Sequence, residues 1–512
     1  MEAYKNTLKE EVEILRSKGR EFLNGELTRN EFKGFSGGMG SYAQKEAGKF
    51  MIRLRTPSGI ITKDHFRLIL NYAENNGLDR IHLTTRQAVQ LHDLTIDQVC
   101  DIMKDGIDHD LFTRGGGGNF PRNVALSPLA GVDTEEVFDV TPYARQVGDY
   151  FLENVRDYKL PRKLKVAFSS SASDTACATL NDLGFIGVID EGRPMFRMWL
   201  AGGMGGQSAL ALPFEELVEP TEVLYYVEAM VRLFAAEGNY ENKSQARTRF
   251  IPRRMGVEAF MECYRKHLEE VKETCAFEGV EPELSTEETS VKETGNPLMI
   301  PQKQDGLYTV VLHPQCGQLL IKDAEKIYEM LSEVLSVEFR LSMDEELYVR
   351  NLTKIQAENL LTAMESSMMT TNVAMSVSCV GTPTCQTGAN QSQKLCREIA
   401  EAVNGMDVSH LPKLYISGCP NCCSRHPVAS MGFAGRRVRI ADDSVEAFDC
   451  FIGGIVGMDK STMGEKAGTI LAEKIPEMIV ELSKDLAEKD KEFTAAVADG
   501  TVEAVIKKYC LA

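Results

Sequence analysis

The chain has 512 residues, of which 43% are hydrophobic and 26% are charged, and its formal net charge at pH 7 is −18. This length suits two to four domains with a large core, and the composition is that of a soluble globular protein. The negative charge argues against bulk nucleic-acid binding, and no apolar run is long enough to span a membrane.

The cysteine content and the first residues indicate the compartment. The N-terminus is charged and lacks the apolar core of a signal peptide, so we expect a cytoplasmic protein with reduced thiols. The chain has 13 cysteines, an odd number. In a reducing compartment this favours metal ligation over a disulfide framework.

The first expected elements are a helical arm and a strand–helix–strand unit. Leu8, Val12 and Leu15 share one face of a helix within residues 1–45. Residues 50–55 alternate as a strand with arginines on one face. The remaining elements of this unit are a helix around 66–72, a strand around 80–83 and a further strand near 89–91.

The same unit returns after about residue 305, which indicates a duplicated domain. Leu83, Leu94 and Thr95 match Leu341, Leu352 and Thr353 at a constant offset. The segments that begin at Leu160 and Leu411 match as well, and this alignment places Cys419 on Ser169 and Cys423 on Ser173. The first copy therefore lacks the cysteine loops of the second and keeps cations instead. We expect an active site between the two copies.

Two cysteine pairs dominate the second copy. They are spaced as Cys379-x5-Cys385 and Cys419-x3-Cys423, with a helix over 395–403 and a strand over 414–416 between them. Four thiolates in two pairs fit a tetrahedral sulfur site. They could instead be small buried residues, or ligands of a structural zinc ion. The first pair is wider than is usual for zinc, so an iron–sulfur cluster is favoured.

This cysteine pattern resembles that of the siroheme-containing sulfite and nitrite reductases, and the resemblance covers nearly the whole chain. It implies that Cys379, Cys385, Cys419 and Cys423 hold a [4Fe–4S] cluster and that Cys423 also bridges to the siroheme iron. It assigns no role to Cys422. The implied fold class is α+β, with duplicated ferredoxin-like half-domains and two α/β siroheme and iron–sulfur lobes around a pseudo-twofold axis.

The domain boundaries expected from this resemblance divide the chain into six parts. They are an N-terminal arm (1–45), ferredoxin-like half-domain 1 (46–115), a first siroheme lobe with the substrate cations (116–262), a linker (263–303), ferredoxin-like half-domain 2 (304–366), and a second siroheme lobe with the cluster (367–512). The linker contains an acidic, Thr/Glu-rich segment that should lie on the surface. The tail from Lys484 to Ala512 should form charged helices.

Four cations of the first copy could act on a substrate: Arg86, Arg122, Lys163 and Lys165. Each alone would be read as a solvated surface charge. Together they lie in the segments that, in the siroheme reductases, surround the substrate on the distal face of the siroheme. Arginine offers a planar fork for oxyanions, and lysine is a mobile charge and proton donor. We expect the lysines to donate protons and the arginines to hold the anion.

Siroheme carries eight carboxylates and needs further cations around its rim. Candidates for the rim are Arg53, Arg55, Gln87, Arg247 and Arg249. The alternative is that they are ordinary surface or strand-edge groups. The tract Arg436, Arg437 and Arg439 could dock an acidic electron donor, or it could be a solvated run of charges.

The resemblance implies an oxidoreductase that reduces sulfite to sulfide with six electrons, and nitrite reduction to ammonia is the alternative. Sulfite is favoured because Lys165 is present where many nitrite reductases of this family carry asparagine. Without a G-x-G-x-x-G unit between a strand and a helix, electrons should come from a separate protein such as ferredoxin. We expect no nucleic-acid or membrane partner. The remoter alternatives are a non-enzymatic iron–sulfur protein and a zinc-stabilised module.

Overall fold

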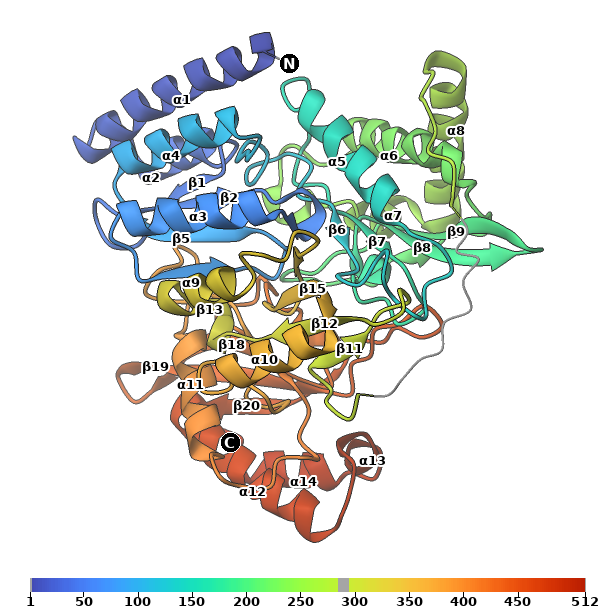
Figure 1. The fold of residues 1–512 in the computed structure, drawn as a ribbon. Helices are drawn as coiled ribbons and strands as arrows, with labels where there is room; N and C mark the ends of the chain where they lie inside the picture. Colours follow the sequence, from blue (N-terminus) through green and yellow to red (C-terminus); the bar gives the residue numbers. More distant parts are fainter. Residues whose placement is uncertain (1, 284–293, 512) are drawn as a thin grey trace.

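The computed structural model describes residues 2–283 and 294–511. The described strands form four five-stranded sheets. In Figure 1 the first half of the chain, from blue to green, lies above the second half, from yellow to red, and each half builds most of two sheets. The expected α+β class, with duplicated half-domains and two larger lobes, is confirmed.

The first half-domain is an antiparallel sheet with packed helices. Its elements are β1 (Ser41–Ala43), β2 (Phe50–Leu54), α3 (Lys63–Asn75), β4 (Arg80–Leu83), β5 (Val89–Leu94) and α4 (Ile96–Asp108). The arm before it consists of α1 (Glu2–Leu23) and α2 (Arg29–Ser36). Leu8, Val12 and Leu15 of α1 are buried in the half-domain core, as their spacing predicted.

The second half-domain repeats this plan. Its elements are β11 (Met299–Pro301), β12 (Leu307–Leu312), α9 (Ile321–Met330), β14 (Glu338–Leu341), β15 (Leu347–Thr353) and α10 (Lys354–Met364). Even the caps are repeated. Thr95 forms a capping box with Gln98 at the start of α4, and Thr353 forms one with Gln356 at the start of α10.

The two half-domains exchange one strand each. Strand β3 (Ile60–Ile61) leaves the first half and pairs antiparallel with β14, while β13 (Gln318–Leu320) leaves the second half and pairs antiparallel with β4. The sheet orders are therefore β1-β2-β5-β4-β13 and β11-β12-β15-β14-β3. Phe66 stacks on Phe339 across this junction at a ring-centroid distance of 4.4 Å, so both halves share one core.

The first lobe is a mixed sheet, β10-β9-β8-β7-β6, with its own core. Strands β6, β7 and β8 are parallel, and β9 and β10 continue antiparallel. Its elements are β6 (Ala125–Leu126), α5 (Thr141–Glu153), β7 (Val166–Ser169), β8 (Leu183–Asp190), β9 (Arg193–Leu200), β10 (Leu212–Pro213), α6 (Val223–Glu237), α7 (Phe250–Met255) and α8 (Val257–Thr274).

The second lobe has the same mixed sheet, β16-β17-β18-β19-β20. Its elements are β16 (Val377–Ser378), α11 (Ser392–Ala402), β17 (Leu414–Ser417), β18 (Met431–Ile440), β19 (Asp443–Ile452), β20 (Glu465–Leu471), α12 (Ile475–Glu488), α13 (Phe493–Ala498) and α14 (Thr501–Tyr509). Helices α11, α12 and α14 contribute to its core. Lys484 falls inside α12, and helices α13 and α14 lie in the expected C-terminal helical tail, of which Ala512 lies outside the described residues.

The structural alignment of the two lobes differs by two residues from the alignment expected from the sequence. Strand β7 ends at Ser169 and β17 ends at Ser417, so these two serines are equivalent. Beyond them, Asp174 and Cys422 occupy matching left-handed positions, with φ of 52° and 54°.

This register corrects the expected pairing of the cysteines. Cys419 and Cys423 are equivalent to Ser171 and Thr175, and not to Ser169 and Ser173. The composition of the two loops suggested the wrong alignment, because both are rich in small residues. The strand ends decide it, since a sheet fixes register through its hydrogen bonds.

One expected domain boundary falls inside a helix, and another separates two paired strands. Residue 263 lies within α8, so the first lobe extends to the end of that helix at Thr274. Strand β1 lies within the expected arm but pairs with β2 of the half-domain. Of the expected linker, residues 284–293 lie outside the described residues.

The most apolar long helix is too short for a bilayer. Helix α6 has 15 residues, whereas a transmembrane helix needs about 20. Across residues 2–283 and 294–511, no helix combines the length and apolar character that crossing a membrane requires.

The shared core predicts how the halves unfold. Phe66→Ala removes a ring that is 1% exposed and stacked on Phe339, and it should lower the free energy of unfolding by about 3–5 kcal/mol. Ile355→Ala, at a side chain that is 71% exposed, should change it by less than about 0.5 kcal/mol. Urea unfolding followed by circular dichroism measures both. A separate early transition of the first half in Phe66→Ala would contradict a shared core.

Candidate active site and cluster loops

The two cysteine loops leave the second lobe side by side. Strands β16 and β17 are parallel, with Ser378 opposite Ile416. Cys379 follows β16 directly, and Cys419 follows β17 after Gly418. The carboxyl ends of parallel strands meet at one edge of the sheet, and the Gly418 amide donates a hydrogen bond to Cys379 Sγ at 3.2 Å. The loops therefore meet as expected.

Two glycines allow this close approach. Gly381 has a left-handed φ of 59°, and a Cβ there would lie 2.3 Å from Ser392 Oγ. A Cβ on Gly418 would lie 2.7 Å from the Asn390 carbonyl oxygen. Because both positions are filled by neighbouring atoms, a larger residue at either one would separate the two loops.

The four thiols act on one another electrostatically. Burial raises the pKa of Cys379, and Cys423 and Cys419 raise it further. Burial also raises the pKa of Cys419, with added repulsion from Cys423 and Cys385. All four sulfur atoms thus belong to one group, in which thiolates would repel each other unless a metal centre neutralised them.

The donor set fits an iron–sulfur cluster. Within the described parts of the chain, no three histidine, cysteine or acidic side chains gather tightly enough for a single metal ion. A four-iron cluster is larger than one ion and spaces its thiolates further apart. All four donors are sulfur, and Cys379 Sγ has hydrogen-bonding partners in the Gly418 amide and, at 3.5 Å, in Ser392 Oγ.

Cys422, which the sequence left without a role, ties the cluster loop to the first lobe. Its Sγ donates to the Gly205 carbonyl at 3.1 Å and lies 3.5 Å from Ser208 Oγ. Its φ of 54° is left-handed, and its side chain is 5% exposed. The lone thiol gave no signal in the sequence, because only the fold brings Gly205 and Ser208 to it.

The first-copy cations converge on this loop. Burial lowers the pKa of Lys163 to about 7, and Arg247 and Arg122 lower it as well, while the Cys423 thiolate opposes them. Burial lowers the pKa of Lys165 well below its usual value, with repulsion from Lys163 adding to it. These effects place Lys163 close to Lys165, Arg122 and Cys423, in one group of basic side chains whose charges oppose one another.

The Arg86 guanidinium is already occupied by the protein. It donates to Asn181 Oδ1 at 2.8 Å, to the Val166 carbonyl at 2.8 Å and to the Asn123 carbonyl at 3.2 Å. Burial lowers its pKa to about 9. Instead of offering a free fork to an anion, Arg86 braces the start of β7 and the segment after Arg122.

Gln87, expected at the siroheme rim, is a structural clasp. Its side chain is buried, donates to the carbonyls of Leu126 and Leu341 at 2.6 and 2.7 Å, and accepts from the Leu126 amide at 2.9 Å. These bonds join the first half-domain to the first lobe and to the second half-domain. The structure thus gives Gln87 a role between domains, and does not support one at the rim.

Two of the candidate arginines keep hydrogen-bond donors that no described residue accepts. Arg122 Nε and Arg249 Nη1 are buried and have no hydrogen-bond partner within the described residues. Gly203 leaves space in front of Arg249 Nη1. A Cβ at Gly203 would lie 3.2 Å from Arg249 Nη1 and 2.9 Å from Arg247 Nη2. Buried donors of this kind need an acceptor, and the carboxylates of siroheme or a substrate oxyanion would supply one.

The other rim candidates contact the protein. Arg53 donates to the Gly116 carbonyl at 2.6 Å, and Arg55 donates to the carbonyls of Arg114 and Gly148 at 3.3 and 3.4 Å. Arg247 forms a buried ion pair with Asp182 at 2.8 Å.

Asp182 and Tyr42 belong to the site but were not found from the sequence. Asp182 is fully buried and also accepts from the Lys165 amide at 2.8 Å. The Tyr42 hydroxyl accepts from the Gly118 amide at 3.0 Å. Burial would raise the pKa of Tyr42, but the neighbouring Arg122 and Arg53 outweigh it and lower the pKa. Neither residue lies in a recognisable motif.

The arginines of the candidate docking tract form ion pairs with acidic side chains of the same lobe. Arg436 contacts Asp449 at 3.3 Å, Arg437 contacts Glu446 at 3.4 Å, and Arg439 contacts Asp442 at 3.8 Å. These pairs lie along β18 and β19 and on their connection. They favour the interpretation of a solvated, internally neutralised run.

Two protein-family models match the first half of the chain. The nitrite/sulfite reductase ferredoxin-like half domain matches residues 42–106, and the nitrite and sulphite reductase 4Fe-4S domain matches residues 117–272. The second match is the lobe without the cysteine pairs. Its equivalent, the second lobe, carries them, as expected for a duplicated domain.

Whole-length relatives agree with these matches. A ferredoxin–nitrite reductase of Synechococcus elongatus is 27% identical over 450 residues, covering 85% of this chain and 86% of the relative. A ferredoxin sulfite reductase of Mycolicibacterium paratuberculosis is 25% identical, covering 86% and 82%. The solved structure of Mycobacterium tuberculosis NirA has the same fold, with a TM-score of 0.77, 23% identity, and coverage of 92% and 91%. The chain is therefore similar over most of its length to nitrite and sulfite reductases, and these matches support an oxidoreductase with siroheme and a [4Fe–4S] cluster.

Proposed function

We propose that this enzyme reduces sulfite to sulfide with six electrons, at a siroheme joined to the cluster through Cys423. The observation that carries the proposal is the group of half-buried basic side chains beside Cys423, in which Lys163 interacts electrostatically with Lys165 and Arg122. Burying several basic side chains together costs electrostatic free energy, and a bound anion would offset that cost. Siroheme, when bound, supplies the iron to which the anion binds and the path for electrons from the cluster.

The lysines are the proposed proton donors. Each S–O cleavage needs a proton at the departing oxygen, and a donor works best when its pKa is near the ambient pH. Burial brings the pKa of Lys163 to about 7, which suits this task. The backbone of Lys165 is held by Asp182, which fixes the segment that carries both lysines directly before β7.

The arginines divide into two roles. Arg122 donates to the carbonyls of Gly116 and Gly118 at 3.0 and 2.7 Å and keeps Nε unused among the described contacts, so it can bind an oxyanion. Arg86 donates to protein acceptors from all three of its nitrogens and positions the Arg122 and Lys165 segments. Arg247 and Arg249 are proposed for the siroheme carboxylates, since they lie against the same glycine-lined space.

Nitrite is the second candidate substrate. Most of the relatives are named ferredoxin–nitrite reductases, including a chloroplastic enzyme of Zea mays that is 28% identical. Sulfite remains our choice because Lys165 adds a second lysine, which better matches an anion that carries up to two charges and must lose three oxygens.

The electron donor is proposed to be a ferredoxin, and the compartment to be the cytoplasm. The relatives are named for ferredoxin, and the chain lacks a dinucleotide-binding glycine motif. The cysteine content supports a reducing compartment. Because the tract at Arg436–Arg439 is neutralised by acids, docking there would require those ion pairs to rearrange.

Removing the proposed proton donor should slow turnover. Lys163→Met should reduce kcat with sulfite by about 10²–10⁴-fold, because proton transfer would then depend on water. Turnover with a chemically reduced donor measures this, and the visible spectrum checks that siroheme is still loaded. Lys394→Met, at a surface lysine of α11, is the matched control and should retain wild-type kcat. Unchanged turnover in Lys163→Met would remove this role.

The second lysine should set the substrate preference. Lys165→Asn should lower kcat/KM for sulfite relative to nitrite by roughly tenfold, because the loss of one charge costs the more highly charged anion more. Parallel titrations of both anions with the same donor measure the ratio. Lys165→Arg keeps the charge and should keep more of the sulfite preference. An unchanged ratio in Lys165→Asn would contradict the choice of sulfite.

The cysteine pairs should decide iron content. Wild-type protein should contain about four iron and four acid-labile sulfide per chain. Cys385→Ala should abolish most of this content, while Cys396→Ala, at a buried cysteine in the core of the same lobe, should retain it. Iron, zinc and sulfide analysis after anaerobic purification makes the comparison. Stoichiometric zinc without iron would overturn the cluster assignment.

A further inference from the structure

The turn between β14 and β15, Ser342–Glu346, is built like the turn that carries Arg86. We call it the acidic turn. Ser342 Oγ accepts from the amides of Asp344 and Glu346 at 3.0 and 3.2 Å. In the first half, Thr84 Oγ1 accepts from the amides of Arg86 and Ala88 at 3.3 and 3.1 Å. The two turns share one backbone but carry opposite charges.

Glu345 holds the strand that leads to the first cysteine. Its Oε2 accepts from the Ser378 amide at 3.0 Å, and Ser378 directly precedes Cys379. Its equivalent in the first half is Gln87, which accepts from the Leu126 amide in the same way. Both residues have left-handed φ, 66° and 52°.

The Glu345 carboxyl behaves like the Gln87 amide. It is 1% exposed, and its Oε1 has no hydrogen-bond partner among the described residues. Burial raises the pKa of Glu345 well above its usual value, which favours the uncharged carboxyl. An uncharged carboxyl and an amide have nearly the same shape, which makes glutamine the conservative replacement.

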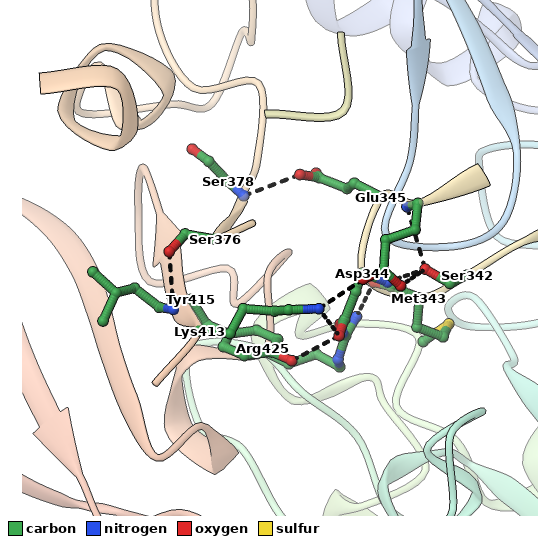
Figure 2. Close-up of polar contacts among 11 residues, drawn as sticks. Ser342, Met343, Asp344, Glu345, Ser376, Ser378, Lys413, Tyr415 and Arg425 are labelled. Atoms are coloured by element: carbon green, nitrogen blue, oxygen red, sulfur yellow. Dashed lines mark hydrogen bonds and ion pairs between the residues drawn. The ribbon is translucent and has the colours of Figure 1, made fainter. Parts of the chain in front are cut away.

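Asp344 holds the segment after the last cysteine. It forms an ion pair with Arg425, whose Nη1 also donates to the Met343 carbonyl at 2.7 Å. Asp344 Oδ2 accepts from the Tyr415 hydroxyl at 2.9 Å and lies 3.3 Å from Lys413 Nζ. Figure 2 shows Arg425, Lys413 and Tyr415 converging on this one carboxylate.

The charges of this cluster are balanced. Burial would raise the pKa of Asp344, but Lys413 and Arg425 outweigh it and lower the pKa. Lys413 also contacts Glu346 at 2.7 Å, and Asp344 and Glu346 raise its pKa despite burial. Removing Asp344 would leave the buried Arg425 and the half-buried Lys413 with less counter-charge, which destabilises the folded protein.

We propose that Asp344 and Glu345 are positioning residues for the iron–sulfur cluster. Two successive side chains of the acidic turn hold the two cysteine loops: Glu345 fixes the entry to Cys379, and Asp344 fixes the exit from Cys423 through Arg425 (Figure 2). The half-domain thereby sets the distance between loops that belong to the lobe. This inference rests on the proposed ligation of the cluster by the four cysteines.

The test compares cluster retention in purified holoenzyme variants. Asp344→Asn and Glu345→Ala should lose iron to a chelator in air at least fivefold faster than wild type. Glu345→Gln should stay within twofold of wild type, because glutamine performs this task at position 87. Asp490→Asn, at a side chain that is 97% exposed on the same lobe, is the control and should match wild type.

Two further readouts separate positioning from stability alone. The electron paramagnetic resonance signal of the reduced cluster should change in Asp344→Asn, and its midpoint potential should become more positive because nearby cations lose counter-charge. A purely structural role would lower the melting temperature and leave both unchanged. If Asp344→Asn does not fold, Tyr415→Phe removes one hydrogen bond to the same carboxylate and should show a smaller acceleration of iron loss.

The outcomes distinguish this inference from the proposed function. Wild-type rates of iron loss in Asp344→Asn and Glu345→Ala, with iron abolished in Cys385→Ala, would overturn the positioning role and leave the cluster assignment intact. Rapid loss in Glu345→Gln, equal to that of Glu345→Ala, would also overturn it. Wild-type protein without iron would defeat the proposed function itself.

Discussion

The strand exchange between the half-domains is the constraint on which the rest of the molecule depends. Strands β3 and β13 each complete the sheet of the other half, and Phe66 and Phe339 stack where the halves meet. The lobes are attached to half-domains that cannot move independently. This holds the lysines of the first lobe against the cysteine loops of the second, although the two lobes have separate cores.

The duplicated half-domains contain two copies of one turn, and the two copies differ in the charge of their side chains. In the first copy the turn carries Arg86 and Gln87, which brace the segments of the substrate cations. In the second copy the same backbone carries Asp344 and Glu345, which contact the segments of the cluster ligands. A buried cation group can bind an anionic ligand, whereas a neutralised network of ion pairs is closed to one. Under the proposed function, this asymmetry accounts for a single active site in a two-copy molecule.

Most buried polar groups in the site form hydrogen bonds to neighbouring residues, and only a few keep donors that a ligand could use. Arg86, Gln87 and Asp182 are hydrogen-bonded to protein, while Arg122 and Arg249 keep donors without partners in the described structure. The bonded groups hold the unbonded ones in place, which reduces the reorganisation needed when an anion binds. This division explains why a cationic residue in the right segment need not touch the substrate.

The sequence by itself determined the duplication, the fold class, the four cysteines and the group of cations, because each depends on spacing along the chain and on residue type. It misplaced the lobe register by two residues and ended the first lobe inside α8, since loop composition is a weaker guide than strand pairing. It assigned Gln87 to the siroheme rim, where the structure does not support it, and it found no role for Asp182, Cys422 or Asp344. Their roles arise from contacts between segments far apart in the chain, and only the packed tertiary structure decides which buried donor meets which acceptor.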